Sequence, residues 1–163
     1  MKAQYPDLEK GRRIAREIGA KFEKNYHQTD TYFNVLKGRL KLREFEIEDA
    51  QLIFYQRPDQ TEVKLSDYHI YPVGDPSQLK VVLQASLGVW QVVEKWRDVF
   101  WYDEVRIHLD RVQDLGTFLE FEGLLSQPSD GPAVEEKVKG LMGQFEIPGS
   151  DLIDKSYSDM KLN

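Results

Sequence analysis

The chain has 163 residues, and its 22 lysines and arginines against 28 aspartates and glutamates give a formal net charge of −6. This length suits one domain over residues 1–163 with its own core, and the acidic balance argues against nucleic acid or an anionic membrane as a partner. The lack of cysteine excludes disulfides and thiolate metal sites. No apolar run reaches the length of a membrane span and no signal-peptide pattern is present, so we expect a cytoplasmic protein.

The first part of the chain predicts one helix followed by strands. Asp7 is a suitable N-cap for a helix that ends at Gly19. A loop at residues 26–30 should lead into a short strand at residues 31–33, which are β-branched or aromatic. The next strands are expected at residues 39–43, 51–57 and 62–70.

The middle and end of the chain predict two more helices around further strands. Asp75 and Pro76 combine an N-cap with a proline at the first helical position, which predicts a helix that ends at Gly88. A strand should follow at residues 92–102, and a third helix should begin near residues 131–132. The buried stripe of the second helix should consist of Leu79, Val82, Leu83 and Leu87.

Residues 104–122 predict an antiparallel hairpin with one apolar and one ionisable face. Side chains alternate along a strand, so every second residue from Val105 to Leu109 is apolar. The residues between them are ionisable, and after the turn Glu120 and Glu122 share one face. A lone hairpin of this kind is usually solvated on its charged side. The ionisable side chains of the first strand are Glu104, Arg106, His108 and Asp110.

The same alternation recurs on other strands, which weakens the solvated interpretation. Cations alternate with apolar residues at residues 39–43 and 95–97, and Lys64 lies on one face of its expected strand. A sheet solvated on one side does not require arginine on so many strands. We therefore expect an α+β fold in which an antiparallel β-barrel closes around a charged interior, with helices flanking it.

The charges of this interior predict its ligands. Because cations outnumber anions there, a polyanion such as a triphosphate is the expected guest, bound by arginine forks and lysine point charges. The carboxylates of Asp110, Glu120 and Glu122 would hold Mg²⁺ or Mn²⁺, which take oxygen ligands. Arg39 belongs to the expected cation set through its strand position.

Seven segments, in the right order over nearly the whole chain, resemble the CYTH superfamily, the triphosphate tunnel metalloenzymes. That superfamily includes class IV adenylyl cyclases and thiamine or inorganic triphosphatases, and the wording of the motifs is most similar to the cyclase branch. The segments are Gln28-x-Asp30-Thr-Tyr-Phe33, Gly38-Arg-Leu-Lys-Leu-Arg43, Leu52-Ile-x-Tyr-x-Arg57, Lys95-x-Arg97, Arg106-x-His-Leu-Asp110, Leu115-Gly-x-Phe-Leu-Glu-x-Glu122 and Ser156-Tyr-Ser-Asp159.

The resemblance implies a role for individual residues. Glu120 and Glu122 would bind the metal, with Asp110 as a further ligand or as a residue that supports the ligands. Lys2 matches the lysine of an N-terminal Glu-x-Glu-x-Lys signature and, with Lys95 and Arg106, forms the expected catalytic set. The residues implied or expected to bind the triphosphate are Arg39, Lys41, Arg43, Arg57, Lys64, Lys95, Arg97 and Arg106.

The sequence departs from the family at its beginning, where Met1 directly precedes Lys2. Both glutamates of the signature are therefore absent, which leaves three accounts: a start assigned too late, a truncated chain, or a true loss of one metal site. We expect this version to bind divalent metal weakly and to turn over slowly.

Several functions fit these observations. The main expectation is conversion of ATP into cyclic AMP and pyrophosphate. The alternative reaction is hydrolysis of thiamine triphosphate, a nucleoside triphosphate or tripolyphosphate. A non-catalytic binder of nucleotide or polyphosphate fits the missing glutamates, whereas a lipocalin-like carrier is disfavoured because its pocket would be apolar. The expected partners are ATP or another small triphosphate and, as a homodimer, a second copy, with no nucleic acid and no membrane.

Two kinds of residue have competing interpretations. His108 is either a ligand or proton shuttle, or a histidine that simply hydrogen-bonds its charged neighbours. The three tryptophans could stack a nucleobase, but aromatic residues on the apolar face of a strand are usually core.

Overall fold

The computed structural model describes residues 1–46, 48–56, 67–125, 127 and 130–161. It consists of two compact units. Unit 1 contains Met1–Asn25 and Trp96–Lys155, and unit 2 contains Tyr26–Lys95 and Ser156–Asn163. Each unit is described by itself, and one domain over residues 1–163 stays a prediction.

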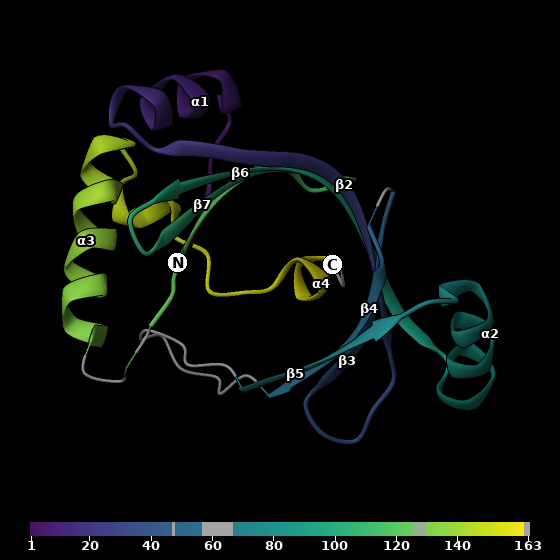
Figure 1. Ribbon diagram of the computed structural model, residues 1–163. Coiled ribbons are helices and arrows are strands. Elements are labelled where there is room, and N and C mark those ends of the chain that lie inside the picture. The colour runs from purple at the N-terminus through teal and green to yellow at the C-terminus, as the bar shows by residue number, and fades with distance from the viewer. Residues whose placement is uncertain (47, 57–66, 126, 128–129, 162–163) are drawn as a thin grey trace. The chain divides into compact units, whose positions relative to one another are not determined.

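Eight strands form one sheet in the order β1-β8-β7-β6-β2-β3-β4-β5 (Figure 1). The predicted α+β fold is confirmed in its antiparallel sheet and flanking helices, whereas closure of this sheet into a barrel stays a prediction. In the part of the chain that the structure describes, none of the helices is both long and apolar enough to cross a bilayer. The strands are β1 Lys2–Gln4, β2 Lys21–Phe33, β3 Arg39–Phe45, β4 Ala50–Gln56, β5 Asp67–Val73, β6 Val89–Tyr102, β7 Val105–Val112 and β8 Gly116–Gly123. The helices are α1 Leu8–Glu17, α2 Pro76–Leu87, α3 Gly131–Gln144, the 3₁₀ turn η2 Gly149–Asp151 and α4 Tyr157–Met160.

The core of unit 1 lies where α1 and α3 pack on β7 and β8. The N-cap prediction for α1 is confirmed, because the Asp7 side chain accepts a hydrogen bond from the Lys10 amide at 2.8 Å. Alternate residues of β7 are buried in this core as the sequence predicts, including Ile107 and Leu109. Their burial fixes the register of β7, so its ionisable residues face away from the helices.

Unit 2 has a smaller core beneath α2, and here the sequence prediction is partly wrong. The predicted N-cap Asp75 and the end at Gly88 are both confirmed. Leu79 and Leu83 pack against the core, but Val82 is 61% exposed and Leu87 is 36% exposed. Helix α2 lies beside the strands of unit 2 (Figure 1), and Val82 and Leu87 are not part of the core cluster on which Leu79 and Leu83 pack.

The largest correction concerns β2, which includes the segment predicted to be a loop at residues 26–30. Its last residues pair with β3, so that Asp30 lies opposite Arg43 and Tyr32 lies opposite Lys41. The prediction failed because this part of β2 alternates between two polar faces and shows no hydrophobic period. Strand β6 likewise begins at Val89, three residues before the predicted start.

The strand predicted at residues 62–70 lies partly outside the described residues. Strand β5 is described from Asp67 to Val73, so it ends three residues later than expected, and the predicted residues 62–66 lie outside the described ranges. Arg57 and Lys64, two of the expected substrate-binding residues, lie outside the described ranges.

Candidate functional site

One buried carboxylate gathers two predicted cations in unit 2. Asp30 on β2 is 2% exposed. Arg43 donates from Nε to Oδ1 at 2.8 Å and from Nη2 to Oδ2 at 3.1 Å. Lys41 donates from Nζ to Oδ2 at 2.7 Å, and Gln28 donates from Nε2 to Oδ1 at 2.9 Å. The β2–β3 register causes this meeting, because paired residues of neighbouring strands share a face.

This cluster shifts the pKa values of its members. Burial alone would raise the pKa of Asp30, but the charges of Arg43 and Lys41 and the hydrogen bond from Arg43 hold it well below its usual range. Burial and the neighbouring Arg43 lower the pKa of Lys41 to about 7, although Asp30 acts in the opposite direction. The lysine therefore changes charge near neutral pH.

Arg39 and Lys95, the other predicted cations of unit 2 among the described residues, also contact neighbouring side chains. Arg39 donates from Nη2 to both carboxylate oxygens of Asp159, at 2.8 and 3.0 Å, and from Nη1 to Ser158 Oγ at 3.0 Å. Lys95 is buried, with its ammonium 5.2 Å from the centre of the Tyr157 ring. Arg39, Lys41 and Arg43 thus pair with the carboxylates of Asp30 and Asp159, and Lys95 is buried in the same unit.

A second buried aspartate organises the predicted site residues of unit 1. Asp110 on β7 is 0% exposed, and Arg97 donates from Nε to Oδ1 and from Nη2 to Oδ2, both at 2.6 Å. The same Nη2 lies 2.9 Å from an oxygen of Glu120 on β8. Arg97 is therefore shared between two carboxylates.

His108 lies between the two glutamates of β8. Its Nδ1 is 3.7 Å from Glu120 Oε2 and its Nε2 is 3.8 Å from Glu122 Oε2. These distances are longer than hydrogen bonds, and among the described residues Nδ1 has no hydrogen-bond partner. Burial and the charge of Arg97 lower the pKa of His108, so the ring is neutral at pH 7.

The pKa of Glu120 lies well below its usual range. Burial alone would raise this pKa, but the adjacent His108 and the charges of Arg97 and Lys2 lower it. Lys2 is itself buried and donates to the Lys155 carbonyl at 2.8 Å. Glu120 therefore stays ionised at neutral pH.

Arg106 completes the unit 1 cluster. Its Nη1 is 3.4 Å from Glu122 Oε2, and its guanidinium lies 4.7 Å from the centre of the Trp101 ring. Its buried Nε has no hydrogen-bond partner among the described residues. Arg106 thus makes a long contact to Glu122 and retains a donor that no side chain described in the structure uses.

The three predicted metal ligands differ in their ability to hold an ion. Within the ranges that the structure describes, no group of three histidine, aspartate or glutamate side chains lies close enough together to hold a metal. Glu120 and Glu122 offer carboxylate oxygens, which fit a hard ion that completes its shell with substrate oxygens. Asp110 does not fit, because Arg97 engages both of its oxygens.

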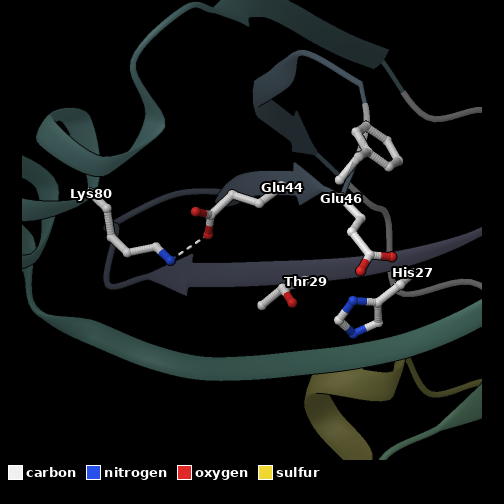
Figure 2. Close-up of a pocket in the computed structure, with 6 residues that line it drawn as sticks. His27, Thr29, Glu44, Glu46 and Lys80 are labelled. Carbon is white, nitrogen blue, oxygen red and sulfur yellow. Dashed lines mark ion pairs between the residues drawn. The ribbon is translucent and has the colours of Figure 1, made fainter.

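A polar pocket of about 230 Å³ lies on the other face of the β2–β3 pair (Figure 2). Thr29 and Glu44 lie opposite each other there, whereas Asp30 and Arg43 are on the face away from it. Lys80 forms an ion pair with Glu44, and His27 Nε2 lies within hydrogen-bond distance of Glu94 Oε1, at 2.8 Å. With Glu46 also in the lining, this pocket carries more acids than cations and does not suit a polyanion.

Sequence reasoning gave no role to Asp30, Gln28 or Asp159, although all three lie in the motifs that resemble the family. A strand over residues 28–32 would place Asp30 on one of its two faces, but residues 26–30 were predicted to be a loop. Asp159 carries a signal in its sequence spacing, since Ser156 and Asp159 form a capping box at the start of α4.

The tryptophans are neither simple core residues nor an isolated stacking platform. Each lies beside an arginine: Trp90 is 5.1 Å from Arg39, and Trp101 is 4.7 Å from Arg106. Trp96 is partly exposed and lies 4.6 Å from the guanidinium of Arg111. Such contacts hold a guanidinium without neutralising it.

Comparisons with known proteins agree with these features. The chain matches the CYTH domain family over residues 1–157. It is 24% identical over 169 residues to the protein named "putative adenylate cyclase" of Methanocaldococcus jannaschii, covering 99% of this chain and 96% of the relative. Its structure resembles a "putative adenylate cyclase" of Vibrio parahaemolyticus, with TM-score 0.83, 18% identity, and coverage of 100% and 96%. It also resembles a Hippeastrum "putative adenylyl cyclase" described as having a dominant triphosphatase activity, with TM-score 0.64, 15% identity, and coverage of 91% and 87%.

Proposed function

We propose, from the premise that this chain belongs to the CYTH domain family, that it is an enzyme that converts ATP into cyclic AMP and pyrophosphate with Mg²⁺ or Mn²⁺. The observation that carries this proposal is that side chains of unit 2 hold four of its cations. Arg39 pairs with Asp159, Lys41 and Arg43 share the carboxylate of Asp30, and the charge of buried Lys95 also acts on Asp30. A triphosphate is a ligand that such a set of cations suits.

The cations of unit 2 would bind the phosphates in two ways. Arg39 and Arg43 present planar forks that match pairs of phosphate oxygens, whereas Lys41 and Lys95 act as point charges. Each already contacts a side chain of its own unit. This fixes their positions before the ligand arrives and lowers the entropy lost on binding.

In unit 1, Glu120 and Glu122 would hold the metal, which would neutralise charge on the triphosphate and its leaving group. Glu120 is suited to this because its lowered pKa keeps it ionised. Asp110 would support these two ligands by holding Arg97 in place, and Arg97 also contacts Glu120. Arg97, Arg106 and Lys2 would add positive charge beside these carboxylates in unit 1.

The residues present suit a reaction that depends on charge neutralisation and alignment. In the cyclase reaction the ribose 3′-oxygen forms a bond to the α-phosphorus and the bond to the pyrophosphate oxygen breaks. In a triphosphatase, water attacks the terminal phosphorus. Both require in-line positioning more than a covalent nucleophile.

A specific comparison favours triphosphatase as the second candidate. The Hippeastrum protein carries a cyclase name but is described as having a dominant triphosphatase activity. At 15% identity the similarity to this protein concerns the fold alone. An experiment must therefore decide between the two reactions.

The deciding experiment is product identification by phosphorus NMR. The protein is incubated with ATP, thiamine triphosphate and tripolyphosphate, each with Mg²⁺ and with Mn²⁺. Cyclic AMP with pyrophosphate supports the cyclase, and orthophosphate supports the triphosphatase. Lys139→Ala is a matched control, because Lys139 is an exposed lysine of α3 that pairs with Glu135 and belongs to neither cluster. Binding of tripolyphosphate without any product would overturn both reactions in favour of a non-catalytic binder.

A further inference from the structure

Asp30 has an unusual environment for a carboxylate. It lies among residues expected to bind an anion, yet it is almost completely buried there. Its Oδ1 accepts from Arg43 Nε and Gln28 Nε2, and its Oδ2 accepts from Lys41 Nζ and Arg43 Nη2. An ionised carboxylate has about four acceptor sites, so all of them are used.

This saturation excludes two common roles for a buried acid. A general base needs a free lone pair for the proton that it removes, and a metal ligand needs one for the ion. Asp30 has neither unless a contact with Lys41, Arg43 or Gln28 breaks. A carboxylate in an anion site would also repel the ligand, so its presence requires another explanation.

We propose that Asp30 is a positioning residue of the triphosphate site, whose single carboxylate holds Lys41 and Arg43 in place and favours the charged form of Lys41. The inference rests on the proposed function, since it assumes that these two cations bind phosphate. Asp30 acts through them and does not touch the ligand.

The surroundings of Lys41 explain why such a carboxylate is needed. Tyr32 on the same sheet lies 3.4 Å from Nζ through its hydroxyl, and the Tyr55 ring centre on β4 is 5.7 Å away. The other charged groups that act on Lys41 are Arg43 and Lys95, both positive. Asp30 is thus the anion that raises the pKa of Lys41, and without it the buried ammonium would lose its proton at a lower pH.

Gln28 shows that the orientation of Asp30 is itself fixed. Its Nε2 must face Asp30, because the reversed amide would place two oxygens together. This choice leaves Gln28 Oε1 buried without a hydrogen-bond partner among the described residues. The amide nitrogen of Gln28 thus donates to Asp30, while its amide oxygen lacks a hydrogen bond among the described residues.

The test is the affinity for tripolyphosphate without metal, measured by calorimetry at pH 6 and pH 8. The variant Asp30→Asn keeps the size of the side chain and removes its charge. We expect the ratio of its Kd to the wild-type Kd to rise about fivefold from pH 6 to pH 8, because lowering the pKa of Lys41 from about 7 by one unit reduces its charged fraction about twofold at pH 6 and about ninefold at pH 8. The protonation of tripolyphosphate affects both Kd values equally, so it cancels in their ratio.

Two further variants separate charge from position. In a Lys41→Arg background the cation cannot lose its proton, so Asp30→Asn should give a ratio that does not change with pH. Asp30→Glu keeps the charge but displaces the carboxylate by one methylene, so we expect a weaker affinity with a constant ratio. Asp30→Glu also keeps the test decisive if Asp30→Asn does not fold, because an affinity equal to wild type would overturn the positioning role.

The outcomes distinguish this inference from the proposed function. A ratio for Asp30→Asn that is the same at both pH values would overturn the inference and leave Asp30 with a structural role only. Failure of the wild-type protein to bind tripolyphosphate at either pH would instead overturn the proposed function. Lys139→Ala should bind as the wild type does at both pH values.

Discussion

Two buried aspartates, Asp110 in unit 1 and Asp30 in unit 2, each bind an arginine through both carboxylate oxygens. Their surroundings differ in charge. Beyond its arginine, the Asp110 cluster contains Glu120 and Glu122, whereas the Asp30 cluster contains Lys41 with the charge of Lys95 nearby. A buried aspartate that binds an arginine through both oxygens therefore lies beside carboxylates in unit 1 and beside cations in unit 2.

This comparison suggests what each aspartate does for its neighbours. Arg97 lies between Asp110 and Glu120 and so reduces repulsion between two acids. Asp30 lies between Lys41 and Arg43 and reduces repulsion between two cations. Under the proposed function, the first arrangement would suit a metal ion and the second a triphosphate. Four predictions test this division, beginning with the largest expected effect.

Replacement of the unit 1 arginine should cost the most stability. Arg97→Met leaves Asp110 buried without its fork, and removal of one partner from a buried ion pair typically costs about 3–5 kcal/mol. Chemical denaturation at pH 7 measures this loss. The double variant Arg97→Met with Asp110→Leu should recover most of it, because both charges are then gone. A single variant as stable as the wild type would show that the pair contributes little to folding.

In unit 2, the free energy of unfolding should depend on pH through Lys41. Its pKa is about 7 in the folded chain and ordinary in the unfolded chain, so above pH 7 the unfolded chain binds a proton that the folded chain does not. Stability should therefore rise from pH 7 to pH 9, by roughly 1 kcal/mol per pH unit from this group. Denaturation of Lys41→Met at both pH values should show a smaller rise. An identical rise in the variant would contradict the lowered pKa.

The opposite sign is expected for Glu120 in unit 1. Its pKa is lower in the folded chain, so its contribution is present above the unfolded value and is lost as the pH falls through the folded value. Glu120→Gln should cost about 1–2 kcal/mol at pH 7, the scale of a hydrogen bond to a charged group. The difference from wild type should shrink below pH 4. Acid unfolding curves that run parallel would argue against an ionised Glu120.

A surface pair outside both clusters should matter least. Lys139 and Glu135 are one helical turn apart on α3 and pair at 2.7 Å. Exposed pairs of this kind contribute little, so Lys139→Ala should change neither the melting temperature nor tripolyphosphate binding measurably. A clear loss of binding in this variant would mean that α3 affects the ligand, and the two-cluster description would then be incomplete.

The parts of the fold that the sequence predicted are those with a strong local signal. The N-caps Asp7 and Asp75 accept their expected helix bonds because the cap and its partner are three residues apart. The alternating apolar residues of β7 predict its buried face, because successive side chains of a strand point to opposite faces. The prediction failed at residues 26–30 of β2, where both faces are polar and no hydrophobic period exists.

By itself, the sequence determined the family, the antiparallel sheet with flanking helices, and the set of charged side chains that alternate along its strands. Which of these charges pair was decided only by the tertiary structure. Asp30 meets Arg43 and Lys41 through the register between β2 and β3, and Asp110 on β7 meets Arg97 on the neighbouring strand β6. The physical reason is that alternation fixes the face on which a side chain lies, whereas the neighbour across that face depends on the register between paired strands.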